Sequence, residues 1–208
     1  VSCNFKITKI LALELSKLFL EVIIGNNFAP SALKILKKKK NLRLVDASDY
    51  IINDNLKYTS ANSEILIQSE DLKKFTTKNF KIVSKRKPST KEMKNLIFAF
   101  NVCRYAKSNA IVIATNETTT GIGSGQPSRL DSCKIAIDKM KKFSNRNKNL
   151  VAASDAFFPF VDGIEKLVQS GVQAVIQPSG SVRDKEIIKF ANETDTALVF
   201  SNTRHFRH

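Results

Sequence analysis

Long apolar runs, histidine and paired cysteines are scarce in this sequence, and each scarcity excludes a class of protein. No run of eighteen apolar residues occurs, so we expect no transmembrane helix and no membrane partner. The two histidines, His205 and His208, stand at the end of the chain, which excludes a histidine-rich metal site. The three cysteines are widely spaced without a CxxC pair, so we interpret them as free thiols of a cytoplasmic protein.

Aromatic residues do not accompany the abundant positive charge. Lysine and arginine number 34 against 19 aspartates and glutamates, which gives a net charge of +15. The lysines are spread along the chain, and the densest run, residues 37–40, contains no aromatic residue. Because nucleic-acid-binding proteins combine basic grooves with stacking aromatics or recognition motifs, we expect no specific nucleic-acid binding. A basic protein that binds nucleic acid through charge alone is kept as an alternative.

The size of the chain permits one large domain or two small ones. It has 208 residues, of which 42% are hydrophobic, enough for a sizeable core. It starts at Val1 without a signal-like segment, so we expect it to begin inside a larger protein. The apolar pattern becomes regular after Pro88, so we divide the chain into a first part, 1–88, and a regular α/β part, 89–208.

The first part contains short apolar patterns. Helical spacing predicts a helix within 8–20 and another over 31–38, the latter opened by Pro30. Residues 48–62 show no assignable pattern. Apolar or alternating runs predict strands at 22–24, 42–45, 64–67 and 80–84.

The second part alternates strands with helices. Ser89 or Thr90 is the expected cap of a long helix whose apolar stripe reaches Cys103. The patterns after it predict strands at 109–115, 149–153, 172–176 and 196–200, and helices at 127–143, 162–169 and 182–192. This alternation implies an α/β fold with a layered mixed or parallel sheet, right-handed crossovers, and helices on both faces.

The glycine-rich stretch TTGIGSGQPSRLDSC, residues 119–133, is the most unusual segment of the chain. We expect Gly121, Gly123 and Gly125 to form a turn that approaches a ligand and enters a helix, where free amides attract anions. Arg129 adds a planar fork of donors. A glycine-rich hairpin beside a surface arginine is the alternative, and the spacing fits neither a Walker loop nor the dinucleotide fingerprint.

Four loops are expected to border a site, because ligands of such sheets bind beyond the carboxyl ends of the strands. The segment SDAFFPFVDG, residues 154–163, places three phenylalanines around a proline, either as core filling or as a platform for a ligand. An acid beside these rings, Asp155 or Asp162, favours a site for a flat ring. The other three loops are the glycine-rich stretch, PSGSVRD (178–184) and TRHFRH (203–208).

Six motifs together resemble one protein family over essentially the whole chain. The motifs are VSKRKP (83–88), KSNAIV (107–112), GIGSGQPSR (121–129), ASDAFFPF (153–160), GVQAVIQPSGSVRD (171–184) and RHFRH (204–208), with a weaker match at LEVIIGNNF (20–28). In this combination the chain resembles the carboxy-terminal part of the bifunctional purine-biosynthesis family that unites AICAR formyltransferase and IMP cyclohydrolase.

The resemblance implies a function in de novo purine biosynthesis. It implies formyl transfer from 10-formyltetrahydrofolate, a co-substrate, to the 5-amino group of AICAR, which gives FAICAR. The implied domain has a cytidine-deaminase-like fold without a metal, works as a homodimer with sites between subunits, and binds no cofactor tightly. The family's catalytic Lys-His pair and its cyclohydrolase domain fall upstream of Val1, so the implied domain is incomplete and no catalytic residue is assigned in this chain.

The resemblance also implies roles for individual residues. Positions that face AICAR in the family correspond to Glu21, Asn109, Arg129, Phe157, Pro159 and Arg204, with Arg204 near the ribose phosphate. Positions that face the folate correspond to Leu130, Asp162, Ser181 and Val182. The chain departs from the family at NSEILIQS (62–69), where relatives carry SGGLLVQD. A catalytically incomplete remnant that only dimerises is therefore a further alternative.

Overall fold

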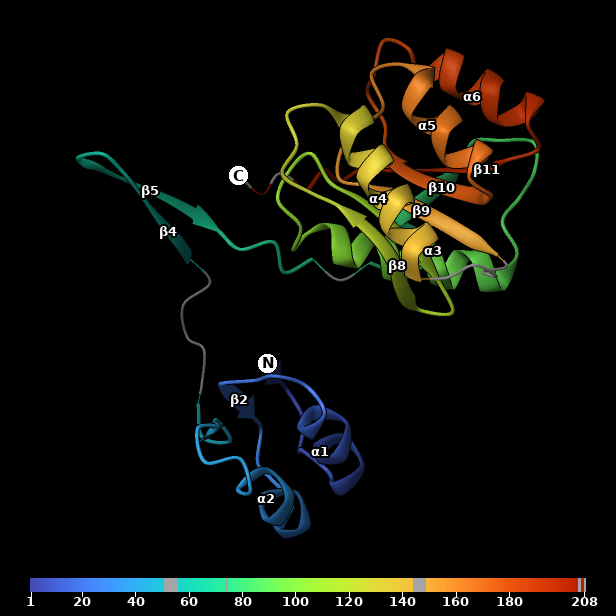
Figure 1. The fold of residues 1–208 in the computed structure, drawn as a ribbon. Helices are drawn as coiled ribbons and strands as arrows, with labels where there is room; N and C mark the ends of the chain where they lie inside the picture. The colour runs from blue at the N-terminus through green and yellow to red at the C-terminus, as the bar shows by residue number, and fades with distance from the viewer. Residues whose placement is uncertain (51–55, 74, 144–148, 206, 208) are drawn as a thin grey trace. The chain divides into compact units, whose positions relative to one another are not determined.

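The computed structural model divides the chain into two compact units, Val1–Glu70 and Asp71–His208. The structure describes residues 1–208 with the exception of 51–55, 74, 144–148, 206 and 208 (Figure 1). No helix within the described residues has the length and apolar character that a bilayer crossing needs.

The first unit contains a parallel three-stranded sheet with one face buried. Its strands β1 (Ser2–Cys3), β2 (Val22–Gly25) and β3 (Arg43–Asp46) lie in that order, and its helices are α1 (Lys9–Ser16) and α2 (Pro30–Leu36). Ile7, Ile23 and Leu36 are fully buried between the sheet and the helices. The predicted helices and strands of this region are present, and Pro30 begins α2 as expected.

A separate hairpin ends the first unit. Strands β4 (Leu56–Ala61) and β5 (Glu64–Ser69) pair antiparallel around Asn62, whose φ is 54°. The strand predicted at 64–67 is part of β5, whereas β4 falls in the stretch without an assignable pattern. Residues 51–55 of that stretch lie outside the described residues.

The second unit is built on a six-stranded mixed sheet in the order β6-β11-β10-β9-β7-β8. The strands are β6 (Phe80–Ile82), β7 (Ile111–Thr115), β8 (Thr118–Gly123), β9 (Leu150–Ser154), β10 (Val172–Pro178) and β11 (Ala197–Ser201). Strands β9, β10 and β11 are parallel, while β6 and β7 run antiparallel to their neighbours. The residues of β7, β9 and β11 are all buried, as expected of strands covered on both faces.

Helices cover both faces of this sheet, which confirms the predicted layered α/β architecture (Figure 1). Helix α3 (Thr90–Cys103) packs on one face, and α4 (Arg129–Phe143), α5 (Val161–Gln169) and α6 (Asp184–Glu193) pack on the other. A short 3-10 turn, η1 (Thr77–Asn79), precedes β6. Ser89 is the cap of α3, because its hydroxyl accepts the amide of Glu92 at 3.2 Å while the Glu92 carboxylate accepts the Ser89 amide at 2.7 Å.

The sequence analysis did not predict strand β8. Because β8 pairs with β7 in a hairpin, β7 does not run in the direction that the predicted crossover would give it. The pattern treated 109–115 and 149–153 as strands joined by a helical crossover, but β7 and β9 are antiparallel. The reason is the tight β7–β8 turn at Asn116 and Glu117, whose φ values of 50° and 51° suit a two-residue hairpin. Consequently the loop that follows β8, not the one after β7, reaches the edge where β9, β10 and β11 end.

Two of the three glycines predicted to approach a ligand instead allow a helix to approach a strand. A Cβ on Gly121 would lie 2.0 Å from the Ala136 carbonyl oxygen, and one on Gly123 would lie 1.9 Å from that of Ser132. Both glycines are in β8 under α4, so the prediction of a single turn was wrong for them and the hairpin alternative was right. Gly125 does lie in the connecting turn, with φ of +70°.

Candidate functional site

A cavity of about 430 Å³ lies at the edge of the second unit where β8 and β9 end. The loop after β8 and the start of α4 form one wall, and the loop between β9 and α5 forms another. The chain's last residues supply Arg204. Predicted AICAR-facing residues that line the cavity are Asn109, Arg129, Phe157, Pro159 and Arg204, and predicted folate-facing residues that line it are Leu130 and Asp162.

Two predicted site residues of the second unit do not line this cavity, and a third belongs to the first unit. Ser181 and Val182 belong to the loop between β10 and α6, and the Val182 side chain is 100% exposed. Glu21 belongs to the first unit, immediately before β2, where its carbonyl oxygen accepts the Arg43 amide at 2.8 Å. The side chain of Glu21 is exposed.

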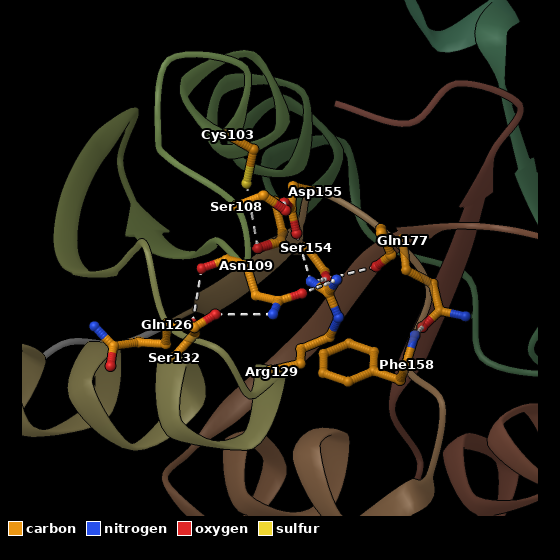
Figure 2. Close-up of polar contacts among 12 residues, drawn as sticks. Cys103, Ser108, Asn109, Gln126, Arg129, Ser132, Ser154, Asp155, Phe158 and Gln177 are labelled. Atoms are coloured by element: carbon orange, nitrogen blue, oxygen red, sulfur yellow. Dashed lines mark hydrogen bonds and ion pairs between the residues drawn. The ribbon is translucent and has the colours of Figure 1, made fainter. Parts of the chain in front are cut away.

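Arg129 is buried and held by three side chains, so it is not the surface arginine of the hairpin alternative (Figure 2). Its Nη1 donates to Ser154 Oγ at 2.9 Å and to the carboxylate of Asp155. Its Nη2 donates to Asn109 Oδ1 at 2.7 Å. The positive charge of Arg129 is therefore compensated inside the protein by a fully buried carboxylate.

Asn109 fixes the connection between β8 and α4. Its Nδ2 donates to the carbonyl oxygen of Gln126 at 2.9 Å and to that of Pro127 at 3.2 Å. The backbone carbonyl oxygen of Asn109 accepts a hydrogen bond of 2.8 Å from the hydroxyl of Ser132 in α4. The contacts with Gln126 and Pro127 use both hydrogens of the Asn109 side-chain amide. The side-chain oxygen Oδ1 is left to accept from Arg129.

Arg204 lies over an aromatic ring of the cavity lining. The centre of its guanidinium is 4.6 Å from the centroid of the Phe157 ring, a cation–π distance. The loop after β10 approaches the same arginine, because a Cβ on Gly180 would lie 3.2 Å from Arg204 Nη2. Gly180 also has φ of +108°, a conformation that glycine adopts without strain.

The three phenylalanines of the FFPF segment have different environments. Phe158 is 1% exposed and packs on Gly163, where a Cβ would lie 2.8 Å from its ring, so this ring fills the core. Phe157 is half-buried beside Arg204, and Phe160 is 52% exposed beneath the guanidinium of Arg183 at 4.8 Å. Both alternatives of the sequence interpretation therefore apply, each to different rings.

His205, Cys103 and Cys133 belong to the interior of this unit. The His205 ring is 2% exposed, packs 4.3 Å from the Phe100 ring centroid, and pairs through Nδ1 with the carboxylate of Asp71. Burial lowers the pKa of His205, although the hydrogen bond and charge of Asp71 oppose this. Cys103 and Cys133 are free and buried, and burial raises the pKa of the Cys133 thiol to about 12.

Sequence reasoning missed the polar residues behind the cavity. Ser108, Ser132 and Ser154 had no predicted role, yet each hydrogen-bonds within the network around Arg129. Asp155 was considered only as one of two acids beside the rings. The available signal was its place at the end of an apolar strand, where a fully buried carboxylate needs a cationic partner.

Fold and cavity define an α/β protein with a cavity lined by arginines and aromatic rings at one edge of its sheet. The sequence model of the AICARFT/IMPCHase bienzyme family matches residues 1–139. Similar relatives are the bifunctional purine biosynthesis proteins PurH of Aquifex aeolicus, 43% identical over 208 residues, and of Brachyspira hyodysenteriae, 41% identical over 210 residues. PurH of Buchnera aphidicola is 44% identical over 194 residues.

The chain therefore belongs to the AICARFT/IMPCHase bienzyme family, which confirms the resemblance read from its motifs. The alignments cover 100% of this chain for the first two relatives and 92% for the third. The same alignments cover 40%, 39% and 37% of those relatives. The chain thus spans about 40% of the length of the curated relatives it matches.

Proposed function

We propose that this chain is the carboxy-terminal part of an AICAR formyltransferase domain, acting in purine biosynthesis in the cytoplasm. The reaction transfers a formyl group from 10-formyltetrahydrofolate to the 5-amino group of AICAR and yields FAICAR. The cavity at the sheet edge is the AICAR site in this proposal. Its volume of about 430 Å³ suits a small ligand, and two arginines and an aromatic ring meet there.

The observation that carries the proposal is that, in the described part of the chain, a carboxylate pairs with one of the two cavity arginines and not with the other. Arg129 is neutralised by Asp155, whereas Arg204 has no carboxylate within ion-pair distance among the described residues. An uncompensated guanidinium is suited to a phosphate dianion, which it can bind through two parallel hydrogen bonds. We therefore assign the ribose phosphate to Arg204 and the uncharged carboxamide side of AICAR to Arg129 and Asn109.

The folate is assigned to the side of the cavity formed by the starts of α4 and α5. Leu130 and Asp162 line that side, and Asp162 Oδ1 accepts the amide of Gly163 at 2.7 Å. Ser181 and Val182, on the loop after β10, are proposed to contact the folate beyond the cavity itself. The folate is a co-substrate in this proposal, and no tightly bound cofactor takes part.

The chemical contribution of this chain is binding and orientation. The amine of AICAR is conjugated with its ring, so transfer requires removal of its proton and stabilisation of the formyl oxygen. Orientation of two reactants can supply about 7–11 kcal/mol, and general acid–base catalysis adds roughly 100 to 10,000-fold. We assign orientation to this chain and proton transfer to the family's Lys-His pair, with active sites formed between subunits of a homodimer.

Calorimetric titration of the 208-residue chain with AICAR tests the proposal. We expect weak, saturable binding that is retained in an Arg207→Ala control, because Arg207 is exposed and donates to the carbonyl of Tyr105 outside the cavity. We expect no formyl transfer by the chain alone. Absence of any AICAR binding would remove the assigned site, and full turnover by the isolated chain would refute the division of roles.

A further inference from the structure

We propose that Asp155 is a positioning residue that holds both cavity arginines, one through its carboxylate and one through its backbone. Its side chain is fully buried at the end of β9 (Figure 2). One carboxylate oxygen accepts from Arg129, and the other accepts from the hydroxyl of Ser108. The inference rests on the proposed function only for the identity of the ligand.

The carboxylate determines which donors of Arg129 remain for a ligand. A guanidinium carries five N–H donors in a rigid plane. Both hydrogens of Nη1 are used by Ser154 and Asp155, and one hydrogen of Nη2 is used by Asn109. The donors without a partner among the described residues are Nε–H and the second hydrogen of Nη2. Asp155 thereby helps to determine which donors of Arg129 remain for a ligand.

The backbone of Asp155 holds the end of the chain that carries Arg204. Its amide donates to the Ala110 carbonyl at 3.2 Å, which fixes the residue against β7. Its carbonyl oxygen accepts the amide of His205 at 2.9 Å. The His205 ring is anchored in turn by Phe100 and by Asp71, so the residue next to Arg204 is tied down on two sides.

The negative charge of Asp155 is kept in the interior by its partners rather than by water. An isolated buried carboxylate is strongly unfavourable, but a cation and additional hydrogen bonds offset the loss of hydration. Its charge also acts on Cys103, whose pKa is raised first by burial and second by Asp155. Asp155→Asn keeps the shape of the side chain and the backbone hydrogen bonds. It therefore removes the negative charge that pairs with Arg129 and keeps the backbone hydrogen bond to His205, next to Arg204.

The first test needs no ligand. Nitrogen-15 NMR of arginine side chains reports rotation of each guanidinium, and the Arg129 signal is assigned by its loss in Arg129→Lys. We expect separate Nη signals for Arg129 in the wild type and in the surface control Asp131→Asn, and averaged signals in Asp155→Asn. Unchanged Arg129 signals in Asp155→Asn would overturn the inference, even if the chain binds no AICAR.

The second test is a double-mutant cycle on AICAR affinity with Asp155→Asn, Arg129→Met and the double variant. Asp155→Asn should weaken AICAR and its phosphate-free nucleoside equally, by about tenfold or more. The double variant should bind as Arg129→Met does, and it should fold even if Asp155→Asn alone does not, because no unpaired buried charge remains. Additive losses of affinity would contradict action through Arg129.

Discussion

The guanidinium of Arg204 lies 4.6 Å from the centroid of the Phe157 ring, so one arginine and one aromatic face form a single unit at the cavity wall. A guanidinium stacked on a ring keeps its in-plane N–H groups available for an anion. This pairing supports the proposed use of Arg204 toward the phosphate, and we propose that Phe157 packs beside the imidazole of AICAR. Each role can be tested by a separate substitution.

Arg204→Ala should discriminate between ligands with and without phosphate. Loss of a charge-assisted bidentate contact is expected to weaken AICAR by about 10- to 100-fold and to change affinity for the phosphate-free nucleoside little. Calorimetry with both ligands measures the difference, and Arg207→Ala serves as the matched control. Equal losses for the two ligands would remove Arg204 from the phosphate.

Phe157→Leu should produce the opposite pattern. The substitution keeps apolar volume but removes the aromatic face, which contributes about 0.5–1.5 kcal/mol beyond buried area. Affinity for AICAR should therefore fall, and affinity for its phosphate-free nucleoside should fall as well. Phe160→Leu is the comparison within the same segment, and a loss in Phe157→Leu that is confined to the phosphorylated ligand would argue against contact with the imidazole.

Gly123→Ala should destabilise the second unit, because it forces β8 and α4 apart. The new Cβ would lie 1.9 Å from the Ser132 carbonyl oxygen, so α4 must move away from β8. We expect the free energy of unfolding to fall by about 1–3 kcal/mol or more, as measured by urea denaturation. Ser124→Ala, one residue further along, should lie within about 0.5 kcal/mol of wild type. A wild-type stability for Gly123→Ala would show that the close packing has no energetic role.

Glu92 should make the stability of the second unit depend on acid pH. Burial raises the pKa of this carboxyl, but hydrogen bonds from Arg86 and Ser89 more than offset burial, so its pKa lies below the usual 4.5. A depressed folded-state pKa contributes stability above about pH 4.5 that is lost as pH falls through the folded value. Glu92→Gln should cost about 1–3 kcal/mol at pH 7 and progressively less below pH 4.5.

Urea denaturation at several pH values measures this difference, with the exposed Glu165→Gln as control. A loss in Glu92→Gln that stays constant from pH 7 to pH 3 would show that the charge of Glu92 is not involved. A loss only at low pH would reverse the sign and contradict the lowered pKa.

Local patterns predicted most elements of the fold because helix caps and buried strands have short-range signatures. Pro30 and Ser89 begin their helices as expected, since both act on the adjacent turn. Strand β8 could not be distinguished from a glycine loop, because the need for glycine at Gly121 and Gly123 comes from a helix packed across them. That need arises from tertiary contacts and leaves no local signal.

The candidate site was predictable in part, because the order of strands and loops follows from local patterns. Loops that follow successive strands were expected to meet at one edge, and the structure brings Arg129, Phe157 and Arg204 into one cavity. The pairing of Arg129 with Asp155 was not predictable, because the two are 26 positions apart and the β7–β8 hairpin is needed to bring them together.

The most direct measurement of the central claim is an NMR titration of the chain with AICAR, followed by backbone amide shifts. The account predicts saturable shifts at Arg129, Phe157 and Arg204, and none around the separate cavity of about 360 Å³ lined by Arg86 and Asp195. Shifts confined to that second cavity, or no shifts at saturating AICAR, would contradict the assignment of the nucleotide to the sheet edge.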